Sequence, residues 1–171
     1  MEQVKTKSVA NLPFELAICG LSELPSALKF QPSHVISITD PDDEDVEFPS
    51  SLTVLRLAFR DVHSAPAFIQ RRAAQDAGLP TIDHAQSILD FGRLLPDGAR
   101  VLAHCWAGMS RSAAAAYLLA CQAMPRAEHA ALDLIKSIRP RAQPNRLLVR
   151  HGDRLLGAGR RMVQCVDRGR S

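Results

Sequence analysis

The sequence contains few cysteines and no closely spaced pair of them. Four cysteines occur in 171 residues, and no two form a C-x-x-C motif. Zinc ribbons and redox-active dithiols depend on such pairs, so neither kind of site is indicated, and disulfide-stapled secreted domains are denser in cysteine. Cys19 and Cys121 lie in apolar stretches and are expected in the core, whereas Cys165 lies near a C-terminal end that we expect to fray. We expect a reducing, cytoplasmic setting.

Long apolar runs and low-complexity tracts are also missing. No stretch approaches the roughly 20 apolar residues of a membrane span, and Glu15 interrupts the short apolar run near the N-terminus. We find no internal repeat and no segment with the composition of a linker between domains. A chain of 171 residues can bury a sizeable core in one domain. We therefore expect a single soluble domain over residues 1–171, with no membrane partner.

Charge of one sign is in only slight excess. The formal net charge is +3, but residues 141–171 hold eight arginines and two aspartates, a net charge of +6, so the rest of the chain totals −3. In this basic end Arg146, Arg150 and Arg154 recur at a spacing of four and would share one face of a helix. These three arginines would form a basic stripe, which in most helices is simply exposed to water. The alternative is that the stripe binds an acidic partner. We expect no nucleic-acid partner.

Hydrophobic periodicity predicts an α/β fold. Apolar stretches bounded by Pro, Asp, Gly or Ser predict strands at Leu16–Cys19, His34–Ile38, Leu52–Ala58 and Arg100–Ala103. Helical spacing predicts helices at Leu21–Leu28, Ile82–Leu95, Ser112–Ala123, Arg126–Ile138 and from Asn145 to about Val166. Interleaved strands and helices, followed by a helical C-terminal half, indicate a central, mostly parallel sheet flanked by helices.

Prolines mark the ends of some predicted helices, and one segment stays open. Pro125 is expected to begin a helix, and Pro140 is expected to end it. The segment Val62–Pro80 fits either a helix at Pro66–Ala77 or an irregular excursion of the chain. The sequence does not decide between these two structures.

One predicted strand-to-helix connection suits the binding of an anion. Residues 101–112 are Val-Leu-Ala-His-Cys-Trp-Ala-Gly-Met-Ser-Arg-Ser, so Cys105 ends the strand and Arg111 follows six positions later. A loop of this length can turn its backbone N–H groups inward, Gly108 permits a close approach, and the following helix adds its positive N-terminal dipole. We expect phosphate or sulfate to bind against the loop residues Trp106, Ala107, Gly108, Met109, Ser110 and Arg111.

Residues at both ends of this loop suit a thiol nucleophile. The planar Arg111 guanidinium can bind two phosphate oxygens at once. Inward N–H groups and a helix dipole favour a thiolate at Cys105. His104 can orient the loop through its ring hydrogen bonds, and the Ser112 hydroxyl can donate to the sulfur when it leaves. A merely structural cysteine, the alternative, would need no glycine, arginine and serine at these offsets.

Residues 104–112, H-C-W-A-G-M-S-R-S, resemble the signature of a known enzyme family. They are similar to the H-C-x-x-G-x-x-R-S/T motif of protein tyrosine and dual-specificity phosphatases. The resemblance extends more loosely from about Leu52 through the last predicted helix, and the first 30 residues match no family. It implies a phosphatase-like fold and hydrolysis of phosphomonoesters by a cysteine nucleophile, without a metal or another cofactor.

The resemblance also implies a general acid, for which the sequence offers three candidates. In the family this aspartate lies on the loop after the strand that precedes the signature strand, which favours Asp61. Asp61 lies 44 residues before Cys105, a longer spacing than in compact dual-specificity enzymes, so Asp76 and Asp83 stay open. An aspartate that only stabilises a turn is the alternative for Asp61. His63 could assist Asp61 or be a solvated bystander.

Several other residues have two interpretations each. Asn145 follows a proline, as in the family's Pro-Asn element, where the side chain braces the active-site loops, or it is simply a helix N-cap. Trp106 and Met109 could shape the mouth of a pocket or, by default, pack against neighbouring loops. The acidic run at residues 40–45 lacks the glycine and the distant glutamate of a calcium loop, so we expect a solvated loop there.

The resulting hypothesis is a metal-independent phosphatase that acts on a phosphorylated protein or a small phosphoester. Phosphotyrosine proteins are the expected substrates, followed by phosphoserine and phosphothreonine proteins. One alternative is a pseudophosphatase that binds phosphorylated ligands without turnover. The other is a rhodanese-like sulfurtransferase, which does not explain His104, Gly108 and Ser112.

Overall fold

The computed structural model describes residues 6–7, 12–66 and 69–169, and its centre is a five-stranded sheet. The strands are β1 (Thr6–Lys7), β2 (Phe14–Gly20), β3 (His34–Thr39), β4 (Thr53–Ala58) and β5 (Ala99–Cys105). They lie in the order β1-β2-β5-β3-β4, with β1 antiparallel to β2 and all other neighbours parallel. The prediction of an α/β fold with a mostly parallel sheet is confirmed.

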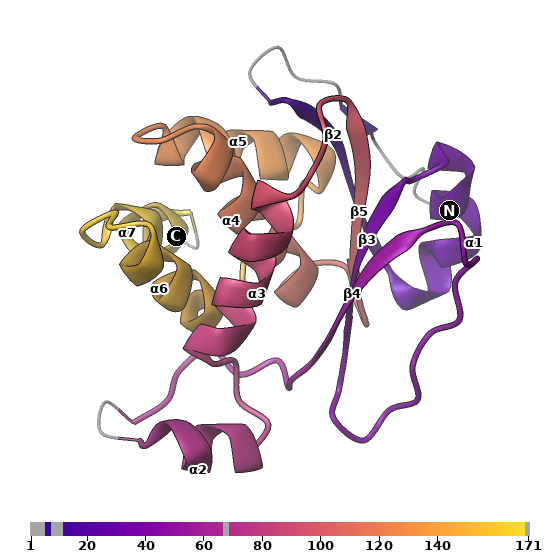
Figure 1. Cartoon of the computed structure of the whole chain (residues 1–171). Coiled ribbons are helices and arrows are strands. Elements are labelled where there is room, and N and C mark those ends of the chain that lie inside the picture. Colours follow the sequence, from indigo (N-terminus) through magenta and orange to yellow (C-terminus); the bar gives the residue numbers. More distant parts are fainter. Residues whose placement is uncertain (1–5, 8–11, 67–68, 170–171) are drawn as a thin grey trace.

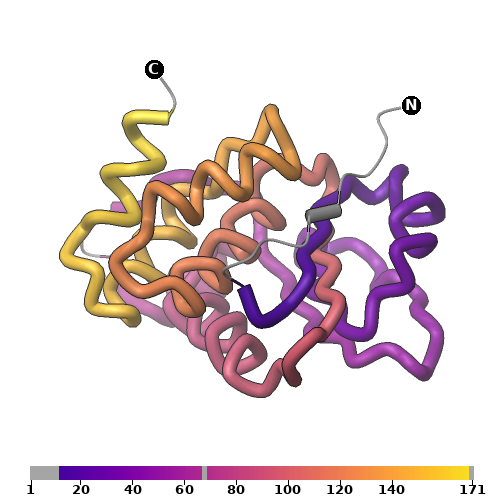
Figure 2. The backbone as a smooth tube through the Cα atoms, turned by 90° about the horizontal axis from the view of Figure 1, so that it is seen from above, coloured from indigo at the N-terminus to yellow at the C-terminus, as the bar shows by residue number. Residues whose placement is uncertain are grey.

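Helices cover both faces of the sheet. The first face carries the 3-10 helices η1 (Leu21–Glu23) and η2 (Leu28–Phe30) on either side of α1 (Leu24–Ala27). The remaining helices are α2 (Arg71–Asp76), α3 (Ile82–Arg93), α4 (Arg111–Ala123), α5 (Glu128–Ile138), α6 (Arg146–Leu155) and α7 (Arg161–Arg168). Helices α3 to α7 lie opposite α1 across the sheet (Figures 1 and 2). Within the described residues, no helix has the length and apolar character needed to cross a bilayer.

Strand β5 lies in the middle of the parallel strands and fixes the position of the signature loop. It pairs with β2 on one side, where Gly20 lies opposite Cys105, and with β3 on the other, where Ser37 lies opposite His104. Parallel strands bring their carboxyl ends to one edge of a sheet, and ligands bind at that edge in open α/β folds. The segments that follow β2, β3 and β4 therefore gather around Cys105.

Helix α4 is the central helix of the larger helical layer. All of its residues from Arg111 to Cys121 are buried, and it packs against the sheet and against α3, α5 and α6. A run of small side chains at Ala113–Ala116 permits this close approach from several sides. Close packing on all sides fixes the start of α4 relative to the end of β5.

The predicted helix from Asn145 to about Val166 is wrong, because it is two helices. Gly157 and Gly159 both adopt positive φ angles, of 62° and 59°, between α6 and α7. The Asp153 carboxylate then accepts hydrogen bonds from the backbone N–H groups of Arg160 (2.7 Å) and Met162 (2.9 Å) at the start of α7. Cys165 is buried in α7, so the expected fraying at this position is also wrong.

Two smaller predictions about helix ends are corrected. Pro125 does not begin a helix: Arg126 has a left-handed φ of 66°, and α5 begins only at Glu128. The predicted helix Leu21–Leu28 is a succession of three short helical pieces. The other predicted strands and helices agree with the structure to within a few residues at their ends, as is usual for such boundaries.

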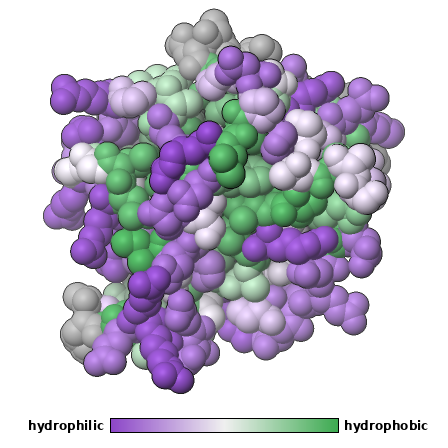
Figure 3. Space-filling model, in the orientation of Figure 1, coloured by the Kyte–Doolittle hydropathy of each residue, from purple (hydrophilic) through white to green (hydrophobic). Residues whose placement is uncertain are grey.

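The open segment Val62–Pro80 combines both structures that were considered for it. It is irregular in the described residues before α2. Helix α2 is shorter than the helix considered at Pro66–Ala77. Residues 67 and 68 of that predicted helix lie outside the described residues. The polar side chains Arg71, Arg72, Gln75 and Asp76 of α2 are exposed. The lower end of the face in Figure 3 is mostly hydrophilic, whereas apolar residues show in its middle.

Candidate active site

The loop between β5 and α4 turns its carbonyl groups outward. Four of them accept hydrogen bonds from neighbouring segments: Trp106 from Leu21 N (2.9 Å), Ala107 from the Arg139 side chain (3.2 Å), Met109 from Gln143 N (2.9 Å) and Ser110 from Asn145 N (3.1 Å). In a trans peptide the C=O group and the next N–H group point in opposite directions. The amides that follow these carbonyls therefore point into the loop, which is the arrangement of an anion cradle.

Cys105 lies at the centre of this cradle. The N–H group of Gly108 donates to its Sγ atom at 3.3 Å, and the Ser112 hydroxyl lies 3.2 Å from the same sulfur. Gly108 has a φ of +69°, and a Cβ atom there would lie 2.3 Å from the carbonyl carbon of Cys19. Only glycine fits this position, so the close approach predicted for Gly108 is present.

Arg111 is buried and lines the same pocket as Cys105. Its Nη1 atom donates to the Asp40 carboxylate (2.7 Å) and to the carbonyl oxygen of Phe59 (2.7 Å). Its Nε atom is buried and has no hydrogen-bond partner in the described part of the chain. A buried N–H group without an acceptor is costly. A phosphate oxygen in the cradle would supply that acceptor with a charge-assisted bond, so the site fits an anion.

Asp61 is held by side chains from two other segments. Its Oδ1 atom accepts hydrogen bonds from Ser110 Oγ (2.6 Å) and from Asn145 Nδ2 (2.8 Å), and His63 Nε2 lies 3.4 Å away. His63 Nε2 also lies 3.2 Å from Ser110 Oγ, so the histidine is part of the cluster rather than a solvated bystander. The cluster ties the loop after β4 to the last residues of the cradle.

Asn145 has both of the roles that were considered for it. Its Oδ1 atom accepts a hydrogen bond from Leu148 N (3.0 Å), which is the contact of a helix N-cap. Its Nδ2 atom donates to Asp61 and to the carbonyl oxygen of Val62 (3.1 Å). One fully buried side chain therefore caps α6 and braces the loop that carries Asp61.

The other two candidates for the general acid lie elsewhere. Asp83, at the start of α3, accepts hydrogen bonds from Arg71 and from Gln75 Nε2 (3.1 Å). Asp76 is exposed at the end of α2. Neither carboxylate lines the pocket that contains Cys105, whereas Asp61 does. The geometry therefore favours Asp61.

The cysteine opens into a pocket of about 500 Å³ at the carboxyl edge of the sheet. Its lining comprises Asp40, Asp43, Arg60, Asp61, Cys105, Trp106, Ala107, Ser110 and Arg111. The prediction of a solvated loop at residues 40–45 is wrong for Asp40, because Asp40 pairs with Arg111. The sequence also did not indicate that Asp43 lines the pocket. The position of Asp40 directly after a strand that was predicted to be parallel was the signal that could have found it.

Two large apolar side chains of the loop are exposed, Trp106 in the lining of this pocket and Met109 in the lining of another. Trp106 is 66% exposed and Met109 is 37% exposed, so neither is packed into the core, which was the default interpretation. Met109 borders a neighbouring hollow of about 470 Å³ that also includes Asp61, His63 and Arg141. The cradle thus adjoins two hollows that are open to solvent.

Burial decides the protonation state of several groups around the cradle. It lowers the pKa of His104 to about 4, so the imidazole is neutral near pH 7 while its Nε2 atom lies 2.8 Å from Ser37 Oγ. Burial raises the pKa of the Cys19 and Cys121 thiols to about 12 and also raises the pKa of Cys165. These three cysteines are therefore thiols near neutrality and cannot replace Cys105 as a nucleophile.

The overall structure is similar to solved phosphatases. No protein-family model matches the chain, and no curated protein sequence does. A crystal structure of DUSP15 is 19% identical, with a TM-score of 0.60 and 95% of each chain covered. PTPMT1 in complex with PI(5)P is 17% identical, with a TM-score of 0.57 and coverage of 90% of this chain and 97% of that one.

A third similar structure is the human tyrosine phosphatase-like serine/threonine/tyrosine-interacting protein. It is 19% identical to this chain, with a TM-score of 0.55, and the alignment covers 92% of this chain and 99% of the other. At such identities the likeness concerns the fold. The chain therefore has the fold of the tyrosine and dual-specificity phosphatases, which confirms the fold implied by the signature at residues 104–112.

Proposed function

We propose that the protein is a metal-independent phosphomonoester hydrolase that acts through a phosphocysteine intermediate, most readily on phosphotyrosine in proteins. The observation that carries the proposal is the convergence, in one pocket, of a thiol, inward-facing amides and an unpaired Arg111 Nε atom. Asp61 lines the same pocket and supplies a carboxyl group for proton transfer. The cysteine content suits a reducing, cytoplasmic setting.

The first chemical step transfers the phosphoryl group to the enzyme. The Cys105 thiolate attacks phosphorus, the bond from phosphorus to the ester oxygen breaks, and the Asp61 carboxyl group gives its proton to that oxygen. The alcohol or phenol then leaves. Arg111 Nε and the cradle amides bind the equatorial phosphoryl oxygens, whose charge they stabilise in the transition state.

The second step releases phosphate. Water attacks the phosphorus atom of phosphocysteine, the Asp61 carboxylate accepts a proton from that water, and the sulfur–phosphorus bond breaks. The Ser112 hydroxyl, 3.2 Å from Sγ, donates to the departing thiolate. Each turnover therefore consumes one water molecule and returns Asp61 and Cys105 to their starting states, with inorganic phosphate as the product.

The surroundings of the cradle favour a protein substrate over a polyanionic one. Three aspartates, Asp40, Asp43 and Asp61, line the pocket beside only two arginines, so a ligand with several phosphates would meet like charge. The exposed Trp106 ring offers a flat apolar surface against which a phosphotyrosine ring can pack. PTPMT1, a structural neighbour, was solved with a phosphoinositide; the aspartates here argue for a different substrate class.

The test is hydrolysis of a small aryl phosphate by the wild type and by Cys105→Ser, in EDTA, from pH 5 to 8. We expect metal-independent turnover that falls at least about 10³-fold in the variant, because the hydroxyl is a far weaker nucleophile. Cys165→Ser, which removes a thiol from α7, is the matched control and should retain activity. Equal turnover by Cys105→Ser and the wild type would refute the proposal. A folded, reduced wild type that binds phosphopeptide without turnover would instead be a pseudophosphatase.

A further inference from the structure

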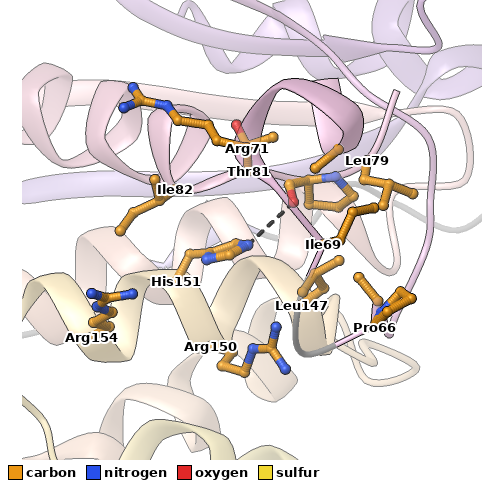
Figure 4. A pocket seen from close by; sticks show the side chains of 13 residues that line it. Pro66, Ile69, Arg71, Leu79, Thr81, Ile82, Leu147, Arg150, His151 and Arg154 are labelled. Atoms are coloured by element: carbon orange, nitrogen blue, oxygen red, sulfur yellow. Dashed lines mark hydrogen bonds between the residues drawn. The ribbon is translucent and has the colours of Figure 1, made fainter. Parts of the chain in front are cut away.

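A second pocket, of about 230 Å³, lies between α6 and the segment that contains α2. Figure 4 shows Pro66, Ile69 and Leu79 on one side of it and Leu147 of α6 facing them. The pocket does not include Cys105 or any other residue of the phosphate cradle. Its apolar interior is open to solvent, so it is not part of the closed core.

The rim of this pocket is basic. Arg150, His151 and Arg154 project from α6 toward it, and Arg71 lies on the opposite side (Figure 4). Arg150 and Arg154 are exposed and form no ion pair with any described residue, whereas Arg71 is bound by Asp83. Two positive charges beside an apolar hollow are thus left without a negative partner.

The size of the pocket limits what can fill it. Sites for whole small-molecule ligands usually enclose about 300–1,000 Å³, so 230 Å³ is small for a cofactor. It is sufficient for one large apolar side chain of a bound peptide. Carboxylates on either side of that side chain would reach Arg150 and Arg154, so the charge and the shape of the pocket select an acidic peptide with an apolar anchor.

The pocket is structurally coupled to the phosphate cradle. The segment from Asp61 to Pro66 runs from the cysteine pocket to this one. On the other side Asn145, which binds Asp61, is followed two residues later by Leu147, which lines the pocket. A peptide bound here would therefore lie next to the loop that positions the proposed general acid.

We propose that this pocket is a docking site for an acidic segment of the substrate phosphoprotein, with an apolar side chain in the hollow and carboxylates on Arg150 and Arg154. The inference rests on the proposed function, because it assigns the pocket to recruitment of the substrate. This docking site gives a role to two arginines of the basic stripe on α6, Arg150 and Arg154. Arg146 is excluded, because it is bound by Asp167 (2.7 Å).

The binding test uses a fluorescein-labelled, unphosphorylated peptide with one phenylalanine between pairs of glutamates. We expect the double variant Arg150→Glu, Arg154→Glu to weaken its binding at least about tenfold, with a smaller effect at high salt. The control is Arg126→Glu, Arg168→Glu, which changes the net charge equally at exposed arginines outside the pocket and should bind as the wild type does. Replacing the peptide's phenylalanine by alanine should also weaken binding.

The activity test separates docking from chemistry. For a phosphotyrosine peptide that carries the acidic segment, the double variant at Arg150 and Arg154 should lower kcat/KM about tenfold, whereas hydrolysis of a small aryl phosphate should be unchanged. Binding that is equal in the wild type and the double variant would overturn the inference. A wild type that does not bind the acidic peptide would also overturn the inference, whether or not it binds phosphatidylserine vesicles. Peptide binding by a wild type that hydrolyses no aryl phosphate would refute the proposed function and leave the docking site standing.

Discussion

Arg139 donates hydrogen bonds of 2.9 Å to both carboxylate oxygens of Glu23, 116 residues away in the sequence. The pair lies directly behind the cradle, because Arg139 also donates to the carbonyl oxygen of Ala107 (3.2 Å) and Glu23 accepts from Gly20 N (2.5 Å). Both side chains are largely buried. The pair therefore holds the cradle against the end of β2 and determines which way the peptide that follows Ala107 points.

Replacing Arg139 with lysine should damage the cradle although the charge is kept. Lysine cannot bind both carboxylate oxygens in one plane and reach Ala107 as well. We expect a loss of about 1–3 kcal/mol in the free energy of unfolding and about a tenfold loss in kcat/KM. Arg93→Lys, at the exposed ion pair with Asp90, is the control and should cost at most about 0.5 kcal/mol. Equal effects of the two substitutions would contradict this role.

Gly108→Ala should abolish the cradle. The new Cβ atom would lie 2.3 Å from the carbonyl carbon of Cys19 and 2.4 Å from Gly20 N, where the neighbour is backbone and cannot move aside. Gly98 is a matched control, because its φ of +75° is also positive but a Cβ atom there would meet nothing within 4 Å. Gly98→Ala should cost about 1–2 kcal/mol for the left-handed conformation alone and keep its activity.

The measurements are aryl phosphate turnover and urea unfolding of both alanine variants. A loss of turnover in Gly108→Ala that clearly exceeds its loss of stability would show that the shape of the loop is what fails. If Gly108→Ala and Gly98→Ala behaved alike, the close approach of the cradle to β2 would have no functional consequence.

The backbone of the loop at residues 105–111 could be predicted because its signals are local. Cys105, Gly108 and Arg111 lie within seven residues, and a strand end, a left-handed glycine and a helix start follow from short-range patterns. The break between α6 and α7 was also local: Gly157 and Gly159 bracket a single alanine, and this signal was present in the sequence but was outweighed by the helical spacing on both sides.

Partners that lie far apart in the sequence could not be predicted in the same way. Asp40 meets Arg111 across 71 residues. Its position after a predicted parallel strand could place it at the carboxyl edge of the sheet, but nothing in the sequence names Arg111 as its partner. The choice of Asp61 over Asp83 likewise needed the fold, since Asp83 is bound by Arg71 on another surface. Such contacts depend on strand order and register, which spacing along one chain does not specify.

Asp61→Asn should slow the proposed hydrolysis most with poor leaving groups. The amide cannot give a proton to the leaving oxygen, and general acid catalysis is worth about 10²–10⁴-fold. We expect a loss of that size for an aryl phosphate with a weakly acidic phenol and a much smaller one for a nitrophenyl ester, which leaves without protonation. The controls are Asp76→Asn and Asp83→Asn, which should leave this turnover unchanged. A large loss in either control would move the general acid to that residue.

Two substitutions at Asn145 should separate its two roles. Asn145→Ser keeps a good N-cap for α6 but removes the amide that donates to Asp61 and to Val62 O, whereas Asn145→Ala removes both. We expect both variants to lose about tenfold in kcat, and we expect alanine to cost about 1 kcal/mol more in stability than serine. Thermal unfolding and steady-state kinetics report the two effects. Full activity in Asn145→Ser would limit the residue to capping.

The stability of the protein should fall as the pH drops from 6.5 to 4, in part because of His104. Burial lowers the pKa of this imidazole from 6.5 to about 4 in the folded state, so between these values the unfolded chain binds a proton that the folded chain does not. Protonation of His104 therefore does not reduce the free energy of unfolding above pH 6.5, and it reduces this free energy progressively as the pH falls toward 4. At about 1.36 kcal/mol per pH unit, the loss from His104 is at most roughly 3–4 kcal/mol.

Urea unfolding of the wild type and of His104→Gln at pH 7, 5.5 and 4.5 checks this. Glutamine does not titrate and can still hydrogen-bond Ser37, so the variant should lose less stability on acidification. Some loss should remain, because burial also lowers the pKa of His84 and of His151. If the free energy of unfolding fell equally with pH in the two proteins, His104 would not be the cause. An NMR titration in which the His104 ring protonates near pH 6.5 in the folded state would also contradict this prediction, because a buried imidazole beside the Ser37 hydroxyl must resist that charge.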